Sequence, residues 1–266
     1  MKIGFVGAGR MAQALGAGIS KNFQSANFFI ADPAADAVQK FAEMVLPQPV
    51  VSAENNQDVF DQSEVVFIAV KPQYLDAALE HVDASSSGPL VISVAAGVTK
   101  KRLAELSGTE RIIRVMPNTP CLIGRGIVAI APDSTISPAD VETTQQLIAT
   151  VGETVLLKEA QLDAVTGLSG SGPAFVYRFI ESLINGGVEQ GLSPEIAAQL
   201  TVQTVLGAAS MVAETGQSCQ QLIDQVTSPG GTTLAGLAAL EAKNFSDTVQ
   251  SAVSSATARS VELGKA

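Results

Sequence analysis

Short apolar runs alternate with amphipathic helical patterns through the first 158 residues of the chain. The runs are rich in β-branched residues and end at Gly, Asp or Pro, which is typical of buried strands. Alternating strands and helices form a mainly parallel sheet covered on both faces. We therefore predict a doubly wound α/β domain over residues 1–158. Its strands are expected at 3–6, 28–31, 50–51, 65–70, 90–94, 112–115, 127–131 and 154–157, and its helices at 11–20, 35–44, 73–80, 100–107 and 138–151.

The pattern changes near residue 158, after which only helical periodicity is found. Ala, Gly, Ser and Thr crowd this part, as in Gly207-Ala208-Ala209-Ser210. Small residues let helices approach closely, and a thin apolar helical unit often packs against a copy of itself. We predict an all-α dimerisation domain over residues 159–266. Its helices are expected at 162–168, 174–190, 194–214, 219–226, 234–243 and 245–263.

A glycine-rich turn joins the first strand to the first helix. The sequence Gly-Ala-Gly-Arg-Met-Ala at residues 7–12 fits the dinucleotide fingerprint, in which Gly7 permits a tight turn, Gly9 admits a pyrophosphate and Ala12 allows close packing. The helix N-terminus adds free N–H groups and a positive dipole. This predicts a Rossmann dinucleotide-binding domain whose turn contacts the cofactor through Gly7, Ala8, Gly9, Arg10 and Met11.

Asp32, at the end of the second strand, leaves two interpretations open. An acidic residue there accepts a hydrogen bond from the ribose 2′-hydroxyl and favours NAD over NADP. Alternatively Asp32, just before Pro33, only caps the following helix. Arg10 could reach a 2′-phosphate from the glycine turn.

Three further strand ends carry polar or tight-turn residues, and ligands of open α/β sheets bind beyond such carboxyl ends. Lys71 is either a contact of the nicotinamide ribose or a solvated cation. Asn118 and Thr119 either bond cofactor or substrate or shape a Pro-rich turn. The candidate cofactor residues at these ends are Ala69, Val70, Lys71, Pro72, Ala95, Ala96, Gly97 and Asn118.

Composition and charge limit the kinds of binding partner that the chain is expected to have. Hydrophobic residues make up 46% of the chain and charged residues 16%, and the net charge is −10, which disfavours nucleic acid and anionic membrane surfaces. Cys121 and Cys219 are expected to be free thiols, and a single histidine, His81, makes a metal site improbable. The start of the chain lacks the order of a signal peptide, and no uninterrupted apolar stretch reaches about 18 residues. A cytoplasmic protein is expected.

Two glycine-rich segments of the helical part are candidates for binding an anion. Residues 166–173 and 227–233 each precede a predicted helix, where backbone N–H groups converge; helix capping by Ser and Thr is the alternative. From residue 159 onward the chain has four basic and ten acidic residues, a net charge of −6. A carboxylate substrate would therefore be held largely by backbone amides and hydroxyls.

The scarcity of His and Lys in the helical part limits the types of reaction that the chain can catalyse. Oxidation of an alcohol usually needs a His or Lys base, and the helical part has no His and only two Lys, far from both glycine-rich segments. Reduction of a C=N bond needs positioning more than acid–base help. The sequence thus favours an imine substrate, with Thr233 as a candidate hydrogen-bond donor.

The run from Asp224 to Thr233, continuing to Glu241, resembles the signature of pyrroline-5-carboxylate reductases. Supporting segments at residues 5–12, 69–72, 93–98, 114–120 and 167–174 match the same family in the same order. The resemblance implies reduction of L-1-pyrroline-5-carboxylate to L-proline with NAD(P)H, the last step of proline biosynthesis. It also implies a Rossmann domain followed by a helical dimerisation domain, and homodimers that assemble into homodecamers.

By the same resemblance, the substrate carboxylate and ring nitrogen would be held by Ser228, Gly230, Gly231, Thr232 and Thr233, with Thr233 as the catalytic hydrogen-bond partner. Gly7, Gly9, Arg10, Met11, Lys71, Ala95 and Asn118 would line the cofactor. The active site would lie between one Rossmann domain and helices of the dimer.

Asp32 is a departure from the family, because many relatives carry Ser or Thr there. A carboxylate pointing inward would repel a 2′-phosphate, whereas the family favours NADPH. The expected cofactor is NADP, with NAD possible. The rival hypotheses are a β-hydroxyacid dehydrogenase relative and a non-catalytic NAD(P)-binding sensor.

Overall fold

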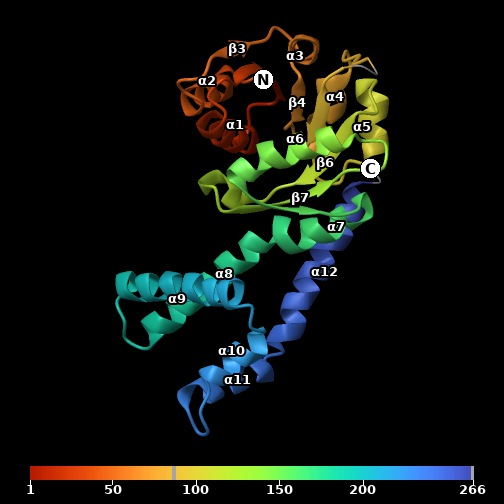
Figure 1. Cartoon of the computed structure of the whole chain (residues 1–266). Coiled ribbons are helices and arrows are strands. Elements are labelled where there is room, and N and C mark those ends of the chain that lie inside the picture. Colours follow the sequence, from red (N-terminus) through yellow and green to blue (C-terminus); the bar gives the residue numbers. More distant parts are fainter. Residues whose placement is uncertain (86–87, 265–266) are drawn as a thin grey trace. The chain divides into compact units, whose positions relative to one another are not determined.

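The computed structural model describes residues 1–85 and 88–264, and their contacts form two compact units (Figure 1). One unit comprises Met1–Ser171 together with Ser254–Ala266, and the other comprises Gly172–Val253. The first unit contains the sheet and the second is helical. These units are defined by compactness, and the division into a cofactor domain and a substrate domain after residue 158 stays a prediction.

The first unit is built on one twisted sheet, which has eight strands in the described residues, in the order β3-β2-β1-β4-β5-β6-β7-β8. Neighbouring strands are parallel except β6 and β7, which are antiparallel. The predicted Rossmann fold class is therefore confirmed. The strands are β1 (Lys2–Val6), β2 (Asn27–Ala31), β3 (Val50–Ser52), β4 (Val65–Ile68), β5 (Leu90–Ser93), β6 (Ile112–Met116), β7 (Gly126–Ala131) and β8 (Gly152–Leu156).

Side chains of the strands alternate between two hydrophobic clusters, one on each face of the sheet. In β1, Phe5 lies in one cluster and Val6 in the other, as the pleat requires. Phe5 stacks on Phe67 with ring centroids 4.9 Å apart, and Phe41 of the helix α2 (Ala35–Met44) packs on Phe5 at the same distance. Both faces are thus buried, which explains why the strands are continuous apolar runs in the sequence.

Three of the helices that cover the sheet begin at a residue whose side chain caps them and one begins at Gly9, whereas the helices that begin after Ala34 and Tyr74 have no side-chain cap. Thr99 accepts a hydrogen bond from the N–H of Arg102 at the start of α5, and Ser137 does the same for Asp140 at the start of α6, so free N–H groups of each first turn are satisfied. These helices are α1 (Arg10–Asn22), α2 (Ala35–Met44), α3 (Asn56–Gln62), α4 (Leu75–Leu79), α5 (Lys100–Ser107) and α6 (Pro138–Ile148).

Helix α3 was not predicted. Its seven residues are too few to show helical periodicity. The available signal was its cap, because Asn55 accepts a hydrogen bond from the N–H of Asp58. The helix predicted at 73–80 also differs, since it begins with a 3-10 turn at Pro72–Tyr74.

The helices after the sheet are α7 (Leu162–Val165), α8 (Gly172–Glu189), α9 (Pro194–Thr215), α10 (Cys219–Gln225), α11 (Thr232–Ala242) and α12 (Phe245–Leu263). In the second unit, α8 packs on α9 where a Cβ at Gly187 would lie 3.3 Å from the Cβ of Ala197. Phe179 and Phe245 tie α8 to the start of α12, with ring centroids 6.1 Å apart.

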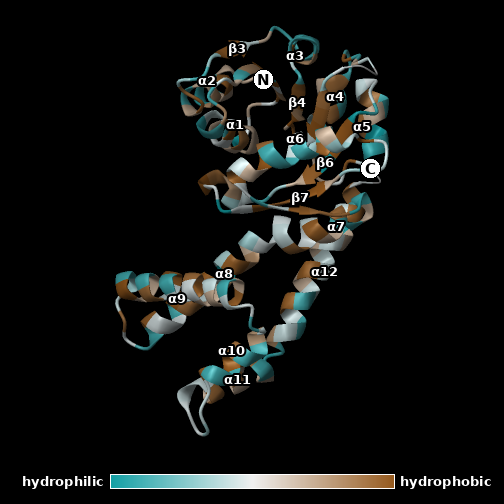
Figure 2. Cartoon of the chain, viewed as in Figure 1, coloured by the Kyte–Doolittle hydropathy of each residue, from teal (hydrophilic) through white to brown (hydrophobic). Residues whose placement is uncertain are grey.

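Helices α8 and α9 contain many apolar residues (Figure 2), and several of these side chains are exposed in the single chain. Tyr177 is 60% exposed, Leu200 54% and Leu206 55%. Helix α9 is long and apolar enough to cross a membrane by length and composition alone, with a mean hydropathy of 1.4 over 18 residues. From the sequence we did not expect a helix of this length and hydropathy, because polar Thr, Gln and Ser residues interrupt the apolar run of α9.

Candidate functional site

The glycine turn sits where the strand order reverses between β1 and β4. Gly7 has φ +95° and donates its N–H to the carbonyl of Ala31 at 2.8 Å. A Cβ at Gly7 would lie 2.9 Å from Val70 Cγ1 and 3.0 Å from the carbonyl oxygen of Ala69. Position 7 therefore excludes a side chain both by its left-handed backbone and by the neighbouring strand end.

Gly9 and Ala12 differ in their surroundings. Gly9 is the N-cap of α1, and a Cβ there would meet nothing within 4 Å, so its backbone faces open space at a helix N-terminus. Ala12 is fully buried against the sheet. The turn thus combines close helix–strand packing with accessible amides, an arrangement that suits a pyrophosphate.

A cleft of about 480 Å³ lies beside this turn, within the size range of small-molecule sites. It is lined by predicted cofactor residues from three strand ends, namely Gly7, Gly9, Asp32, Ala69, Val70 and Lys71.

Other residues that line this cleft were not predicted from the sequence, namely Pro33, Asn56, Tyr74, Ala77 and Ala78. Tyr74 is 60% exposed, and an exposed aromatic residue next to Lys71-Pro72 was a usable signal. Asn56 donates its side-chain N–H to the carbonyl of Ala78 at 2.7 Å and so joins two walls of the cleft.

Asp32 is held by two backbone amides. One carboxylate oxygen accepts the N–H of Ala8 at 2.7 Å, and the other accepts the N–H of Ala34 at 2.8 Å. The second contact is a local turn onto Ala34. Ala34 is itself the N-cap of α2, which has no side-chain cap, so Asp32 does not cap that helix and the capping interpretation is wrong. The first contact joins Asp32 to the glycine turn across the sheet edge. Asp32 also lines the cleft, and its contact with the ribose stays a prediction.

Ala95, Ala96 and Gly97 form a tight turn after β5. Gly97 has φ +76°, and the end of α12 packs closely on it, since a Cβ at Gly264 would lie 2.5 Å from the carbonyl oxygen of Gly97. Ser260 of α12 is buried and donates its hydroxyl to Asp163 at 2.6 Å. The turn is therefore covered by the last turn of α12.

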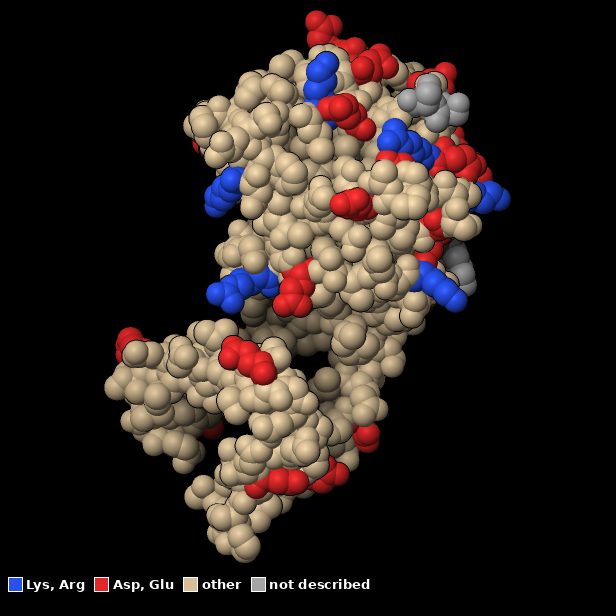
Figure 3. Space-filling model, viewed as in Figure 1, with Lys and Arg blue, Asp and Glu red and all other residues tan. Residues whose placement is uncertain are grey.

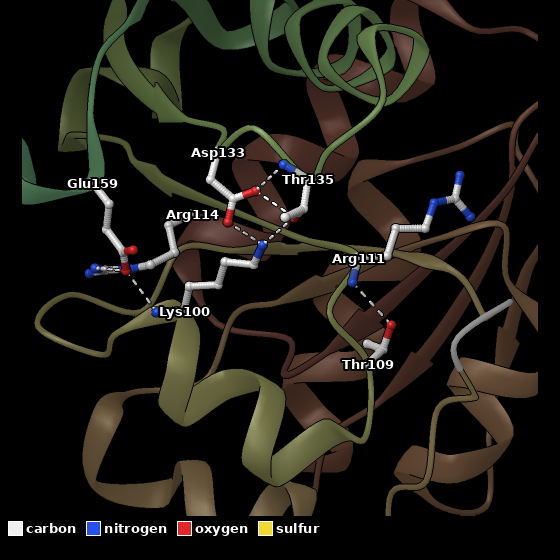
Figure 4. A network of polar contacts seen from close by, with 7 residues as sticks. All are labelled: Lys100, Thr109, Arg111, Arg114, Asp133, Thr135 and Glu159. Atoms are coloured by element: carbon white, nitrogen blue, oxygen red, sulfur yellow. Dashed lines mark hydrogen bonds and ion pairs between the residues drawn. The ribbon is translucent and has the colours of Figure 1, made fainter.

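A polar network fixes the start of α5, directly after that turn (Figure 4). One oxygen of Glu159 accepts the N–H of Lys100 at 2.7 Å and a guanidinium N–H of Arg114 at 2.9 Å. The ammonium of Lys100 contacts Asp133 and also Thr135, the latter at 3.0 Å. Burial alone would raise the pKa of Asp133, but hydrogen bonds from Lys100 and Thr135 outweigh it and lower that pKa. Segments from β6, α5 and the chain after β8 thus meet at one carboxylate.

Asn118 has a structural partner. It is 9% exposed, and its side-chain oxygen accepts the N–H of Ile127 at 3.1 Å, which joins the end of β6 to β7. Neighbouring Cys121 is buried, and burial raises the pKa of its thiol. These contacts agree with the expectation that Asn118 shapes the turn, and its contact with the cofactor stays a prediction.

The predicted substrate loop lies in the helical unit. Gly230 has φ +73°, Gly231 donates its N–H to the carbonyl of Ser228 at 2.9 Å, and Gly231 is the N-cap of α11. No side chain of the described residues caps α11, whereas the hydroxyl of Thr227 bonds back to Ile223 and Asp224 of α10. The first amides of α11, at Thr232 and Thr233, are therefore left available for an anion.

The other glycine-rich segment does not form an anion-binding loop. Thr166–Gly170 is a π-helical turn that follows α7 directly, and Ser171 donates its N–H to the carbonyl of Thr166 at 2.8 Å. The backbone amides of this segment therefore donate hydrogen bonds within the helix and are not available to an anion. A Cβ at Gly170 would lie 2.6 Å from the methyl carbon of Met116, so at least this glycine serves close packing.

Fold and cleft define a dinucleotide-binding protein of the Rossmann type, and comparison with known proteins shows that it is an NAD(P)H-dependent oxidoreductase. Residues 159–263 match the family described as pyrroline-5-carboxylate reductase dimerisation, and residues 2–97 match NADP oxidoreductase coenzyme F420-dependent. The chain is 40% identical to a pyrroline-5-carboxylate reductase of Synechocystis, over 100% of this chain and 99% of that one. It is 35% identical to the reductase of Escherichia coli, over 99% and 98%.

A solved structure of Plasmodium falciparum pyrroline carboxylate reductase with NADP bound is also similar. It is 34% identical, covers 99% of this chain and 98% of its own, and has a TM-score of 0.87. The chain belongs to the pyrroline-5-carboxylate reductase family. The resemblance drawn from the sequence is thereby confirmed, and the helical part is a dimerisation domain.

Proposed function

We propose that the chain reduces L-1-pyrroline-5-carboxylate to L-proline, with NADPH as hydride donor and NADH as the alternative. The observation that carries this proposal is the uncapped start of α11 after Ser228 and Gly230. It offers backbone amides and hydroxyls, without a cationic side chain, in a chain that matches pyrroline-5-carboxylate reductases over its whole length.

The cleft residues fit a nicotinamide dinucleotide. The N-terminal amides of α1 at the glycine turn would bind its pyrophosphate, since Gly9 leaves open space above the helix start. Tyr74 and the small side chains of Ala77 and Ala78 supply an apolar wall, and Lys71 at the end of β4 would contact the nicotinamide ribose. When bound, the reduced coenzyme supplies the hydride; the protein residues position it.

The substrate loop would bind the carboxylate through the amides of Thr232 and Thr233, strengthened by the α11 dipole. The hydroxyl of Thr233 would donate a hydrogen bond at the ring nitrogen. A protonated imine carbon is already electrophilic, so hydride transfer requires orientation and exclusion of water more than a general base. This accords with the lack of His in residues 159–266 and disfavours the β-hydroxyacid dehydrogenase alternative.

A homodimer explains the exposed apolar helices. Leu200 and Leu206 of α9 are each more than half exposed, and a second copy burying them would gain about 25 cal/mol per Å² of apolar surface. We propose that the active site forms between the Rossmann domain of one subunit and helices of the dimer, and that dimers assemble into decamers.

We further propose that the protein is cytoplasmic and binds no membrane, with a second copy rather than lipid covering α9. Lys and Arg appear only over the first unit in Figure 3, and the second unit contains just Arg178 and Lys243. A surface poor in cations supports this proposal because anionic lipid attracts basic clusters. Analytical ultracentrifugation without detergent tests it: soluble dimers or decamers support it, and recovery only with detergent opposes it.

The test of the activity is the initial rate of NADPH and NADH oxidation with pyrroline-5-carboxylate, for wild type, Thr233→Ala and the control Thr248→Ala. We expect Thr233→Ala to lose about 10- to 100-fold in kcat, because one transition-state hydrogen bond is worth about 1.5–3 kcal/mol. Thr248 lies on exposed α12 surface, so its variant should keep wild-type rates. Folded wild type that binds coenzyme without turnover on this substrate would contradict the proposal and favour the sensor alternative.

A further inference from the structure

The end of α12 covers the turn that follows β5. This end of the helix belongs to the same compact unit as the sheet. The three atoms nearest to a Cβ at Gly97 would belong to Gly264, Leu263 and Ser260, at 3.4 to 3.5 Å. Gly97 is buried, so the end of α12 shields the turn from water on that side.

One hydrogen bond holds the end of α12 in this place. Within Phe245–Leu263, all of which the structure describes, Ser260 is the buried residue, with 4% exposure. Its hydroxyl donates to Asp163 of α7 at 2.6 Å, and the end of α12 lies beside α7 in Figure 1. Leu162, the neighbour of Asp163, is buried in a cluster with residues of β7. The acceptor of the hydrogen bond is therefore anchored on the sheet.

The contact between α12 and the turn leaves no room for a further side chain. A Cβ at Gly264 would lie 2.5 Å from the carbonyl oxygen of Gly97, which is too close for two atoms that are not bonded. Gly97 has φ +76°, a left-handed conformation that favours glycine. The position of the Gly97 peptide is thus determined partly by α12, which is distant in sequence.

The strand order places this turn at one half of the expected dinucleotide. A dinucleotide lies across the point where the order reverses, with one mononucleotide over each half of the sheet. The reversal lies between β1 and β4, and the end of β2 belongs to the adenosine half, where the acidic residue of Rossmann folds meets the ribose. The ends of β4 and β5 therefore belong to the nicotinamide half, and the turn Ala95–Gly97 follows β5.

We propose that Ser260 and Gly264 are positioning residues for the nicotinamide half of the coenzyme. They hold the end of α12 against the Ala95–Gly97 turn and so fix the surface on which the nicotinamide and its ribose bind. Both act through the backbone of Gly97 and not by touching the coenzyme. This inference rests on the proposed function, since it requires that the cleft bind NADPH or NADH.

A purely stabilising role of α12 predicts a different result. If the end of α12 only stabilised the fold, loss of its contacts would weaken the whole coenzyme and its adenosine fragment alike, or neither of them. A positioning role weakens the coenzyme and leaves the fragment unchanged, because the fragment lacks the nicotinamide and its ribose. The ratio of the two dissociation constants therefore separates the two roles.

The experiment is calorimetric titration of NADPH and 2′-phospho-ADP, and of NADH and ADP, into the full chain. The variants are Ser260→Ala, Gly264→Ala, Asp163→Ala and Asp163→Asn, the last of which keeps an acceptor oxygen for the Ser260 hydroxyl. The control is Ser255→Ala, at an exposed serine of the same helix. Gly264→Ala removes no hydrogen bond, so it gives an answer even if Ser260→Ala fails to fold.

For whichever coenzyme the wild type binds, we expect the ratio of its Kd to that of its fragment to rise about three- to tenfold in Ser260→Ala and Asp163→Ala. A turn that is no longer held in place must be ordered on binding, at a cost similar to one hydrogen bond. Gly264→Ala should raise the ratio at least as much, because its Cβ displaces the Gly97 carbonyl. The ratio should stay at the wild-type value in Asp163→Asn and Ser255→Ala.

A ratio unchanged in both Ser260→Ala and Gly264→Ala, whether the two affinities fall together or stay the same, would overturn the inference. Failure of the proposed function is distinguishable. If wild type binds neither coenzyme, both proposals fall. If it binds one but does not reduce pyrroline-5-carboxylate, the proposed function fails, and the Kd ratio still decides the role of α12.

Discussion

Removing the Glu159 carboxylate should destabilise the first unit by a measurable amount. In the network of Figure 4, one oxygen of Glu159 binds the Arg114 guanidinium at 2.9 Å and the Lys100 amide at 2.7 Å. The Arg114 side chain is 9% exposed, whereas the Glu159 side chain is 39% exposed. Glu159→Ala would leave a buried guanidinium without its carboxylate and the amide at the start of α5 without its acceptor.

The exposure of the Arg114 and Glu159 side chains determines how much unfolding free energy the Glu159→Ala variant should lose. Breaking a fully buried ion pair costs about 3–5 kcal/mol. Because Glu159 is more than a third exposed, water can partly replace its carboxylate, and we take about 2 kcal/mol. That corresponds to about a thirtyfold change in the unfolding equilibrium, or a fall of about 1 M in the urea midpoint at a typical slope. Glu159→Gln, which keeps an acceptor oxygen, should lose about half as much.

The assay is urea unfolding followed by circular dichroism at pH 7, with Glu153→Ala as control. Glu153 lies on an exposed position of β8, and its loss should cost less than about 0.5 kcal/mol. Because Lys100 begins α5 just after the Ala95–Gly97 turn, we also expect Glu159→Ala to raise the KM for coenzyme more than it lowers kcat. A Glu159→Ala midpoint equal to that of Glu153→Ala would refute the reasoning, since Arg114 would then not depend on this carboxylate.

Three further predictions concern stability, cofactor binding and assembly. The hydrogen bonds from Arg111 hold the pKa of Asp140 below its usual range, so this pair stabilises the fold above about pH 4 and ceases to do so as the pH falls through the lowered pKa. Asp140→Asn should therefore cost about 1–2 kcal/mol at pH 7, and its deficit in urea unfolding should shrink in acid; a deficit independent of pH would contradict this. Gly7→Val should abolish dinucleotide binding in calorimetry, because its side chain would collide with Ala69 and Val70 at φ +95°; retained affinity would show that the turn does not hold the cofactor. Leu200→Glu, at an exposed position of α9, should shift the sedimentation of the protein towards monomer, and an unchanged oligomer would place the interface elsewhere.

Local pattern alone determined the order and type of most elements. The strands are apolar runs because both faces of the sheet are covered by helices. In the second unit, α9 and α10 begin at the Ser193 and Ser218 caps, and Gly191 and Gly216 follow the ends of α8 and α9. The fingerprint at residues 7–12 also follows from sequence, because each of its small residues is required by its own backbone or by adjacent packing. Helix α3 escaped prediction because seven residues show no period.

Contacts between distant residues were decided only by the tertiary structure. Arg114 and Glu159 are 45 positions apart, and nothing in the pattern around either residue names its partner. The glycines at 167, 170 and 172 were expected in a loop. The chain instead continues as a helix from α7 through Gly170, so the backbone amides of this segment donate hydrogen bonds within the helix. Asp32 shows the limit most clearly. Its position at the end of a strand can be predicted from the local sequence. Its hydrogen bond from the N–H of Ala8 cannot, because it forms only when the parallel strands β1 and β2 bring their ends together.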